Sequence, residues 1–417
     1  MINNNMHLDN GITARREIKT PQIKLAEIGE RATSGIRSPL EFFSRCLILI
    51  EHTFVSYDWG VTASVHPIDS DDDFPVDADI PIRSPLVGGP LALFPRPSEC
   101  WSKQNLAPFA RFLRETAQMI TRVAVDAAYG RIRKHVRRTP VMDFDGVTLK
   151  LELFQHSGSF KARGSFNSAL AQGVPNAGLI AASGGNHGIA VAHVARELGV
   201  RAEIYVPATS SPVKIARIRA LGADVHVGGD LYADAQAACD RRIAESGALA
   251  IHPFDEPLTV AGQGTIGIEL EQQIEGLDTV VVATGGGGLA AGIAAALPDV
   301  KIVCVEPRRC CCLHEALAAG EPVAVEIDSI AADSLGARQI GAVPWTVLRD
   351  RANSVLVDDE AIVAARQSLW DQAQIVAEHG GATAYAAIQS GAYSPADGEK
   401  VAVVICGANT DPADLVG

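Results

Sequence analysis

The hexapeptide Ser159–Gly164 (Ser-Phe-Lys-Ala-Arg-Gly) contains the lysine with the clearest potential for chemistry. A lysine amine attacks a carbonyl carbon only after it loses its proton, and partial burial beside apolar groups favours the neutral form. Lys161 directly follows the aromatic residue Phe160 and precedes a small-residue stretch. The alternative is a surface lysine in a loop that starts a helix, because most lysines are exposed. The hexapeptide alone leaves both interpretations open.

The turn Ser183–Gly188 (Ser-Gly-Gly-Asn-His-Gly) joins the end of a predicted strand to the start of a predicted helix. Small residues let the backbone approach a ligand closely, and the N–H groups at a helix start favour an anion such as a carboxylate. Asn186 and His187 add side-chain donors at the same place. An ordinary turn with an asparagine cap is the alternative, and for an isolated turn it is the favoured interpretation.

The glycine run Thr284–Leu289 (Thr-Gly-Gly-Gly-Gly-Leu) also follows an apolar strand and opens a predicted helix. Consecutive glycines expose several backbone N–H groups at the positive end of a helix, which is typical of a phosphate site. Gly285, Gly287 and Ala290 also satisfy the looser dinucleotide fingerprint, and Glu306 lies at the end of the next strand. A dinucleotide site is therefore a local alternative, although it leaves Lys161 without a role.

Cys406 follows a third apolar strand, at a carboxyl end where parallel sheets bind ligands. A thiol at that place is a weak and neutral donor. The alternative is a buried structural cysteine, which is the commoner case for this residue type.

Alternating strands and helices are needed to position these turns, and the sequence predicts them from residue 119 onward. Strand–helix alternation at this spacing indicates βαβ units and parallel sheets. We therefore predict an α/β protein with two parallel-sheet domains, of which the smaller (175–255) is inserted in the larger (119–174 and 256–417). The predicted strands are 147–152, 179–182, 202–207, 223–227, 248–251, 278–283, 301–305 and 401–405, and the principal predicted helices are 123–136, 189–198, 212–221 and 290–297.

Composition excludes several classes of function. The net charge of -13 leaves no basic stripe for nucleic acid, and no apolar run is long enough to span a membrane. Eight cysteines in 417 residues do not form a disulfide framework, and Cys310, Cys311 and Cys312 are adjacent. We expect reduced thiols, a cytoplasmic location and a small-molecule partner.

Residues 1–118 show no sustained periodicity and include an acidic cluster and the Pro/Gly-rich stretch 81–97. We expect either a disordered native extension or a segment that is not normally translated, with Met119 as the true start. At the other end, no regulatory segment of useful length follows Cys406, so feedback inhibition is not expected.

Taken together and in order, these motifs resemble the serine/threonine dehydratase family of fold-type II pyridoxal-phosphate enzymes. The resemblance covers residues 119–417 and includes a further stretch, His252–Asp255 followed by Ala261–Gly267. It implies a fold like that of the tryptophan synthase β subunit, a pyridoxal 5'-phosphate cofactor and a homodimer or higher homo-oligomer. It also assigns the glycine run to the single phosphate of that cofactor rather than to a dinucleotide.

The resemblance implies a role for each motif. Lys161 would form the Schiff base with the cofactor and take the substrate's Cα proton, and Phe160 would pack beside the ring. Asn186 would bond the ring hydroxyl, and Cys406 would face the pyridine nitrogen, where many relatives have serine. The expected phosphate ligands are Gly285, Gly286, Gly287, Gly288 and Leu289, and the expected substrate-carboxylate ligands are Ser183, Gly184, Gly185, Asn186 and His187.

Two departures from the family pattern carry further expectations. Serine racemases have a serine base at the position of Gly184, so we predict elimination without efficient racemisation. Relatives with a divalent cation bind it through a glutamate equivalent to Glu306 and an aspartate at the position of Cys312. Because a thiol is a poor ligand for magnesium or calcium, we predict no metal site.

The resulting expectation is a threonine/serine ammonia-lyase that forms a 2-oxo acid and ammonia. Alternatives within the family are a hydroxyaspartate ammonia-lyase, a threonine synthase and a serine racemase. The remaining alternatives are a non-catalytic relative that binds the cofactor and a dinucleotide-binding protein.

Overall fold

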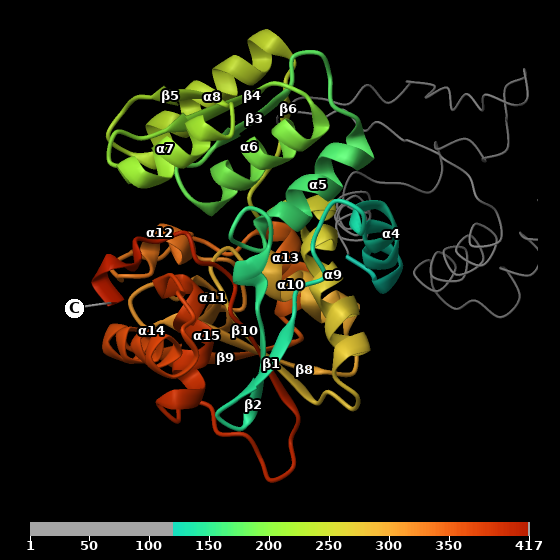
Figure 1. The fold of residues 1–417 in the computed structure, drawn as a ribbon, viewed down its shortest axis with the longest axis vertical. Coiled ribbons are helices and arrows are strands. Elements are labelled where there is room, and N and C mark those ends of the chain that lie inside the picture. Colours follow the sequence, from blue (N-terminus) through green and yellow to red (C-terminus); the bar gives the residue numbers. More distant parts are fainter. Residues whose placement is uncertain (1–119, 416–417) are drawn as a thin grey trace, which may run out of the picture. The chain divides into compact units, whose positions relative to one another are not determined.

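The computed structural model describes residues 120–415. Two parallel sheets organise this part of the chain, each with helices on both faces (Figure 1). The expectations for residues 1–118 lie outside the described residues. Among the described residues, no helix is both long and apolar enough to cross a membrane.

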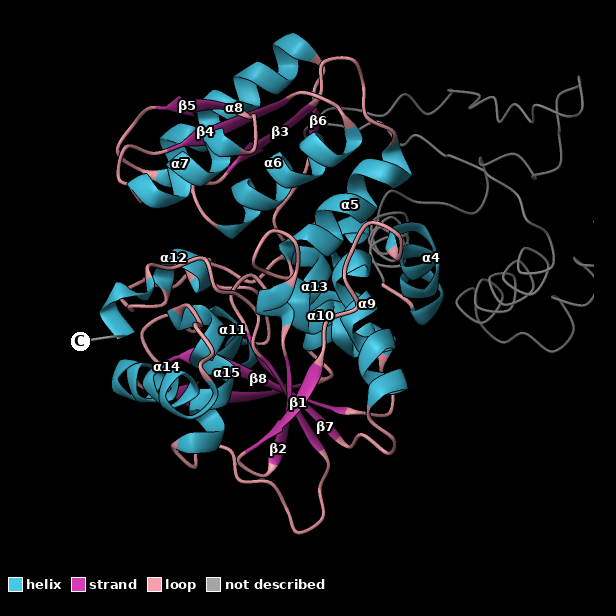
Figure 2. Cartoon of the chain, viewed as in Figure 1, coloured by secondary structure: helices cyan, strands magenta, loops and turns pink. Residues whose placement is uncertain are grey.

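The larger sheet has six strands in the order β1-β2-β10-β7-β8-β9. Strand β10 pairs in parallel with both β2 and β7, and β7, β8 and β9 continue in parallel. In Figure 2, α9 and α10 pack on one side of this sheet, whereas α14 and α15 pack on the other. Its strands are β1 (Val141–Phe144), β2 (Val147–Lys150), β7 (Thr279–Ala283), β8 (Lys301–Pro307), β9 (Ala352–Val357) and β10 (Val401–Val404).

One strand of the larger sheet departs from the parallel arrangement. Strand β1 pairs with β2 in the antiparallel direction, through a two-residue turn at Asp145 and Gly146 with φ of 50° and 77°. Positive φ at both turn residues matches the twist of a tight hairpin. Strands β1 and β9 were not predicted from the sequence.

The smaller sheet has four parallel strands in the order β5-β4-β3-β6. In Figure 1, α8 covers one face, and α6 and α7 lie on the face toward the larger sheet. All four strands fall within 175–255, and we propose to keep these residue boundaries for the smaller domain. The strands are β3 (Leu179–Ala182), β4 (Ala202–Val206), β5 (Asp224–Val227) and β6 (Leu249–Ala250).

The helices complete both layers. Helix α5 links the two sheets, because it packs against α9 beside the larger one and α6 beside the smaller one. The helices are α4 (Arg122–Ile132), α5 (Lys161–Gln172), α6 (Asn186–Leu198), α7 (Pro212–Ala220), α8 (Tyr232–Ser246), α9 (Pro257–Gln273), α10 (Gly288–Ala296), α11 (Cys312–Ala319), α12 (Ala332–Leu335), α13 (Ala342–Leu348), α14 (Asp359–Ala373) and α15 (His379–Gln389), with short 3-10 helices η2 (Glu152–Phe154) and η3 (Pro412–Leu415).

Burial explains why the strands read as continuous apolar runs. Every residue of β3, β7 and β10 is buried, as expected for strands that have helices on both faces. The glycine-rich turns after β3 and β7 and the segment after β10 therefore emerge at the carboxyl ends of buried strands, where parallel sheets bind their ligands.

Candidate active site

Lys161 is the first residue of α5 and is partly buried. Its Nζ donates to the carbonyl oxygen of Pro253 at 2.8 Å and lies 4.9 Å from the centre of the Phe160 ring. Burial lowers the pKa of Lys161 to about 8, and the nearby Cys406 and Glu378 oppose this change only in part. The positive end of α5 acts in the same direction as burial, because it disfavours a cation there. About a tenth of the amine is therefore neutral at pH 7, and this fraction rises to about half near pH 8.

Backbone pairing brings the lysine segment to the end of β10. The N–H of Phe160 donates to the carbonyl oxygen of Cys406 at 3.1 Å, and Ser159 forms an isolated bridge with Gly407. Cys406 is buried, and burial raises the pKa of its thiol. The thiol is consequently neutral over the physiological range, as the sequence analysis assumed.

Ion pairs hold the start of α5 in the core. The guanidinium of Arg163 is fully buried and bonds Glu152 at 2.7 and 2.8 Å and Glu269 at 2.7 Å. Lys150 completes this network through Glu269 at 2.6 Å. A buried cation with two carboxylate partners is strongly held, because loss of one partner leaves an uncompensated charge. Arg163 therefore anchors the helix that carries Lys161.

The glycine run forms the N-terminal end of α10, and surrounding atoms leave no room for larger residues. A Cβ on Gly286 would lie 2.4 Å from the Phe254 ring, and one on Gly288 would lie 2.8 Å from the Phe254 carbonyl oxygen. Gly287 has φ of 88°, a left-handed conformation that favours glycine. The first N–H groups of α10 have no partner within the helix. These features fit a phosphate group at the helix start.

A single segment, 251–255, connects the glycine run to the lysine and to the Ser183–Gly188 turn. Pro253 accepts from Lys161, and Phe254 packs on the glycines. Ile251 contacts His187 through its carbonyl oxygen at 2.7 Å. Three motifs that are far apart in sequence therefore converge at the carboxyl ends of β3, β6 and β7.

The side chain of His187 cannot donate to a substrate carboxylate, as the sequence had suggested it would. Its Nε2 faces a carbonyl oxygen, which only accepts, so Nε2 must carry the proton. Burial lowers the pKa of His187 to about 3, and its buried Nδ1 has no hydrogen-bond partner among the described residues. The neutral ring can only accept through Nδ1. Any contact of His187 with a carboxylate would therefore use its backbone N–H at the start of α6.

The side chain of Asn186 is fixed at both ends by residues that the sequence analysis did not identify. Its Nδ2 donates to Glu378, and its Oδ1 accepts from Asn409 at 2.6 Å. Burial raises the pKa of Glu378 to about 7. Glu378 precedes α15, and no local pattern in the sequence marks it as part of the site. Asn409, by contrast, lies only three residues after Cys406, which the sequence did indicate.

Gly184 packs directly against a hydroxyl group. A Cβ on Gly184 would lie 2.2 Å from Ser210 Oγ and 2.7 Å from Ser210 Cβ. A serine at position 184 would therefore clash with Ser210 unless the loop before α7 moved. The Ser210 side chain therefore occupies the space that a side chain at position 184 would need.

Glu306 and Cys312 make contacts inside the protein. The Glu306 carboxylate accepts from the backbone N–H groups of Leu313 and His314, each at 2.8 Å, and Cys312 Sγ contacts the Gly285 carbonyl oxygen at 3.3 Å. Burial raises the pKa of Glu306 to about 8. Within residues 120–415, no cluster of three His, Cys, Asp or Glu residues could hold a metal ion. The expected lack of a metal site stays a prediction.

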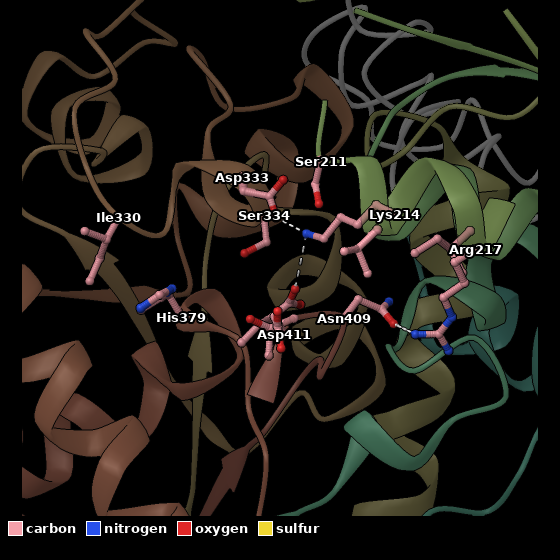
Figure 3. A pocket seen from close by; sticks show the side chains of 13 residues that line it. Ser211, Lys214, Arg217, Ile330, Asp333, Ser334, His379, Asn409 and Asp411 are labelled. Atoms are coloured by element: carbon pink, nitrogen blue, oxygen red, sulfur yellow. Dashed lines mark hydrogen bonds and ion pairs between the residues drawn. The ribbon is translucent and has the colours of Figure 1, made fainter. Parts of the chain in front are cut away.

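A cavity of about 230 Å³ lies beside Asn409 and Glu378, between α7 and the segments that precede α12 and α15 (Figure 3). Its polar lining includes Lys214 and Arg217 from α7. Neither Lys161 nor the glycine run lines it, so it adjoins the site through Asn409 and Glu378.

Comparison with known proteins agrees with this geometry. Residues 132–407 match the family described as "Pyridoxal-phosphate dependent enzyme". The chain is 36% identical to a phenylserine dehydratase of Ralstonia pickettii over 70% of this chain and 93% of that protein. It is 35% identical to an L-threonine ammonia-lyase of Geobacter sulfurreducens, over 70% of this chain and 76% of that protein.

A solved structure of maize serine racemase is similar to the described fold, with a TM-score of 0.67 and 31% identity over 71% of this chain and 96% of that one. The chain therefore belongs to the fold-type II pyridoxal-phosphate-dependent enzymes, within the serine/threonine dehydratase group. Pyridoxal 5'-phosphate is its cofactor. Membership of this family makes the chain a pyridoxal-phosphate enzyme rather than a dinucleotide-binding protein.

Proposed function

We propose that this enzyme is an L-threonine/L-serine ammonia-lyase. The observation that carries the proposal is the partly buried amine of Lys161, with a pKa lowered to about 8, beside a glycine run at a helix start. A lysine in this state can bond to a carbonyl carbon and can later accept a proton. Relatives named as threonine ammonia-lyase and phenylserine dehydratase support removal of a β-hydroxyl from an amino acid.

Each group of residues has a proposed role toward cofactor and substrate. The N–H groups of Gly285 to Leu289 would hold the cofactor phosphate, Phe160 would pack beside the ring, and Cys406 would face the ring nitrogen. Asn186 donates to the ring oxygen, while Ser183 to His187 bind the substrate carboxylate, largely through backbone N–H groups. When bound, the cofactor withdraws electrons from the bonds of the substrate's Cα.

Lys161 performs the proton transfer in this proposal. Its neutral Nζ accepts the Cα proton, and the β-hydroxyl group leaves with a proton as water. Hydrolysis of the released product gives a 2-oxo acid and ammonia. Because burial keeps the Cys406 thiol neutral, it would not hold a proton on the ring nitrogen, and the bound cofactor would then favour loss of the β-hydroxyl.

The experiment is a 2-oxo acid assay with L-threonine, L-serine, β-phenylserine and β-hydroxyaspartate. We expect turnover of threonine and serine, and loss of all turnover in Lys161→Ala. Lys134→Ala, on an exposed side chain, is the matched control and should retain activity. Full activity of Lys161→Ala would refute the proposed base, and turnover confined to phenylserine or hydroxyaspartate would refute the proposed substrates.

Racemisation needs its own measurement because of Ser210. We predict that the enzyme converts L-serine to pyruvate much faster than it converts L-serine to D-serine. Formation of D-serine from L-serine should be measured with the unmodified protein and with Ser210→Ala. A D-serine rate that rivals pyruvate formation would contradict the prediction, and its loss in Ser210→Ala would identify the hydroxyl responsible.

A further inference from the structure

Two positively charged side chains of helix α7, Lys214 and Arg217, point toward Asp333 and Asn409 of the larger domain (Figure 3). Lys214, which is buried, pairs with Asp333, and its Nζ lies 3.9 Å from Glu378 Oε2. Arg217, one turn later, donates to Asn409 Oδ1. Arg217 is exposed and makes no ion pair with a carboxylate among the described residues, where its guanidinium bonds only to the amide of Asn409.

The contact with Arg217 sets which way the Asn409 amide points. The Oδ1 atom of Asn409 accepts from the guanidinium, while its Nδ2 donates to the Ser157 carbonyl oxygen at 3.1 Å and to Asn186 Oδ1 at 2.6 Å. A flipped amide would place an NH2 group against a cation and an oxygen against two acceptors. Only one orientation is therefore favourable.

The fixed orientation of the Asn409 amide also fixes the orientation of the Asn186 amide. Its Oδ1 accepts from Asn409, and one hydrogen on its Nδ2 is used by Glu378. An amide nitrogen carries two hydrogens, so a single N–H remains for another acceptor. The direction of that remaining donor follows from the two contacts already made.

These links also join the two parts of the fold. Asn186, Lys214 and Arg217 lie around the smaller sheet, whereas Glu378 and Asn409 lie around the larger one. These contacts join both α7 and the start of α6 to residues around the larger sheet. The position of the smaller domain is therefore coupled to the orientation of the Asn186 amide.

We propose that Arg217 is a positioning residue that acts through Asn409 to orient the Asn186 amide toward the cofactor. Lys214 supports it by holding α7 against Asp333 and Glu378. This inference depends on the proposed contact between Asn186 and the cofactor. It predicts that Arg217, which is more than one side chain away from that contact, controls the affinity for pyridoxal 5'-phosphate.

The test measures the dissociation constant for pyridoxal 5'-phosphate titrated into the cofactor-free full-length protein. Arg217→Met should weaken cofactor binding by about tenfold, which corresponds to about 1.4 kcal/mol, the scale of one hydrogen bond to a charged group. Arg219→Met is the matched control, because Arg219 is exposed on the same helix and its side chain bonds to no other described residue. The control should bind the cofactor as the unmodified protein does.

Asn409→Asp separates orientation from simple attachment. The aspartate keeps an acceptor for Arg217, and thus the link to α7, but it removes the donor to Asn186 Oδ1. We expect cofactor binding to weaken by about tenfold in this variant too. Combining Arg217→Met with Asn409→Ala should weaken binding no more than Asn409→Ala alone, because both act through one path.

Several results would overturn the inference. Tight cofactor binding by Asn409→Asp would show that Arg217 only connects the two domains and does not orient Asn186. A fall in the unfolding midpoint of the cofactor-free Arg217→Met protein that fully accounts for its weaker binding would indicate a merely structural role. An equal loss in Arg219→Met would show a general charge effect. The 2-oxo acid assay is a separate readout, so failure of the proposed lyase reaction would leave the cofactor titration interpretable.

Discussion

Replacement of Lys161 by methionine should abolish turnover and yet stabilise the cofactor-free protein at neutral pH. In the folded protein, burial lowers the pKa of this lysine from 10.5 to about 8. The folded state therefore binds the lysine proton less tightly than the unfolded state does. Below pH 8 the lysine is charged in both states, and folding carries the full cost of burying that charge.

The size of this cost follows from the pKa values. At about 1.4 kcal/mol for each pH unit, the lowering from 10.5 to about 8 corresponds to about 3 kcal/mol. Methionine removes this cost but also removes the hydrogen bond to the Pro253 carbonyl oxygen, which is worth about 1 kcal/mol. We expect a net gain of about 2 kcal/mol at pH 7.

The sign of the pH dependence provides the sharpest check. As pH rises from 8 to 10.5, the folded protein has already lost the proton whereas the unfolded chain still binds it, so the unmodified protein becomes more stable relative to the variant. The advantage of Lys161→Met should therefore be complete at pH 7 and disappear before pH 10.5, where the lost hydrogen bond leaves the variant about 1 kcal/mol less stable than the parent.

The assay is guanidinium unfolding of both proteins after removal of pyridoxal 5'-phosphate, since bound cofactor would stabilise only the protein able to hold it. Lys134→Met, on an exposed side chain, serves as the control for the substitution itself and should gain nothing. A variant less stable than the parent at pH 7 would refute the reasoning, as would a gain of equal size at pH 7 and pH 10.

Two further substitutions probe the glycine run and the anchor of α5. Gly286→Ala places a Cβ 2.4 Å from the Phe254 ring, so pyridoxal 5'-phosphate should bind at least tenfold more weakly in a fluorescence titration, roughly the cost of overpacking. Gly130→Ala meets nothing within 4 Å and should bind the cofactor normally; equal binding by both variants would contradict the argument. Arg163→Met leaves the buried Glu152 without its ion-pair partner, whereas Glu269 keeps Lys150, and the loss should cost about 3 kcal/mol in the free energy of unfolding. An unchanged unfolding midpoint would show that the ion network does not anchor α5.

Local sequence patterns predicted the parts of the fold that depend on local physics. Buried parallel strands read as apolar runs, and each was placed to within a few residues at β3, β4, β7 and β10. The glycine turns after β3 and β7 could be found because close packing excludes side chains in both turns and Gly287 also has positive φ, so glycine is required there and is visible in the sequence. Strand β1 was missed even though Asp145–Gly146 is a turn signal, because its four residues do not alternate between buried and exposed.

The contacts that hold Asn186 could not be predicted in the same way. Glu378 reaches Asn186 across 192 residues of sequence, and no spacing rule connects a glutamate before one helix to an asparagine at the start of another. Pro253 contributes only a carbonyl oxygen, which every residue possesses. Residues that act through backbone atoms or through distant partners leave no distinctive pattern, and the three-dimensional arrangement is needed to find them.

The relation between Gly184 and Ser210 shows how the arrangement in space changes a conclusion drawn from one position. The sequence predicted no hydroxyl beside the substrate, because position 184 is glycine. In the structure Ser210 Oγ lies 2.2 Å from the place of the missing Cβ, so the two positions share one volume. Only one of them can carry a side chain of this size, and the chain has placed it at 210. We therefore propose Ser210, rather than position 184, as the hydroxyl whose contribution to racemisation the Ser210→Ala assay tests.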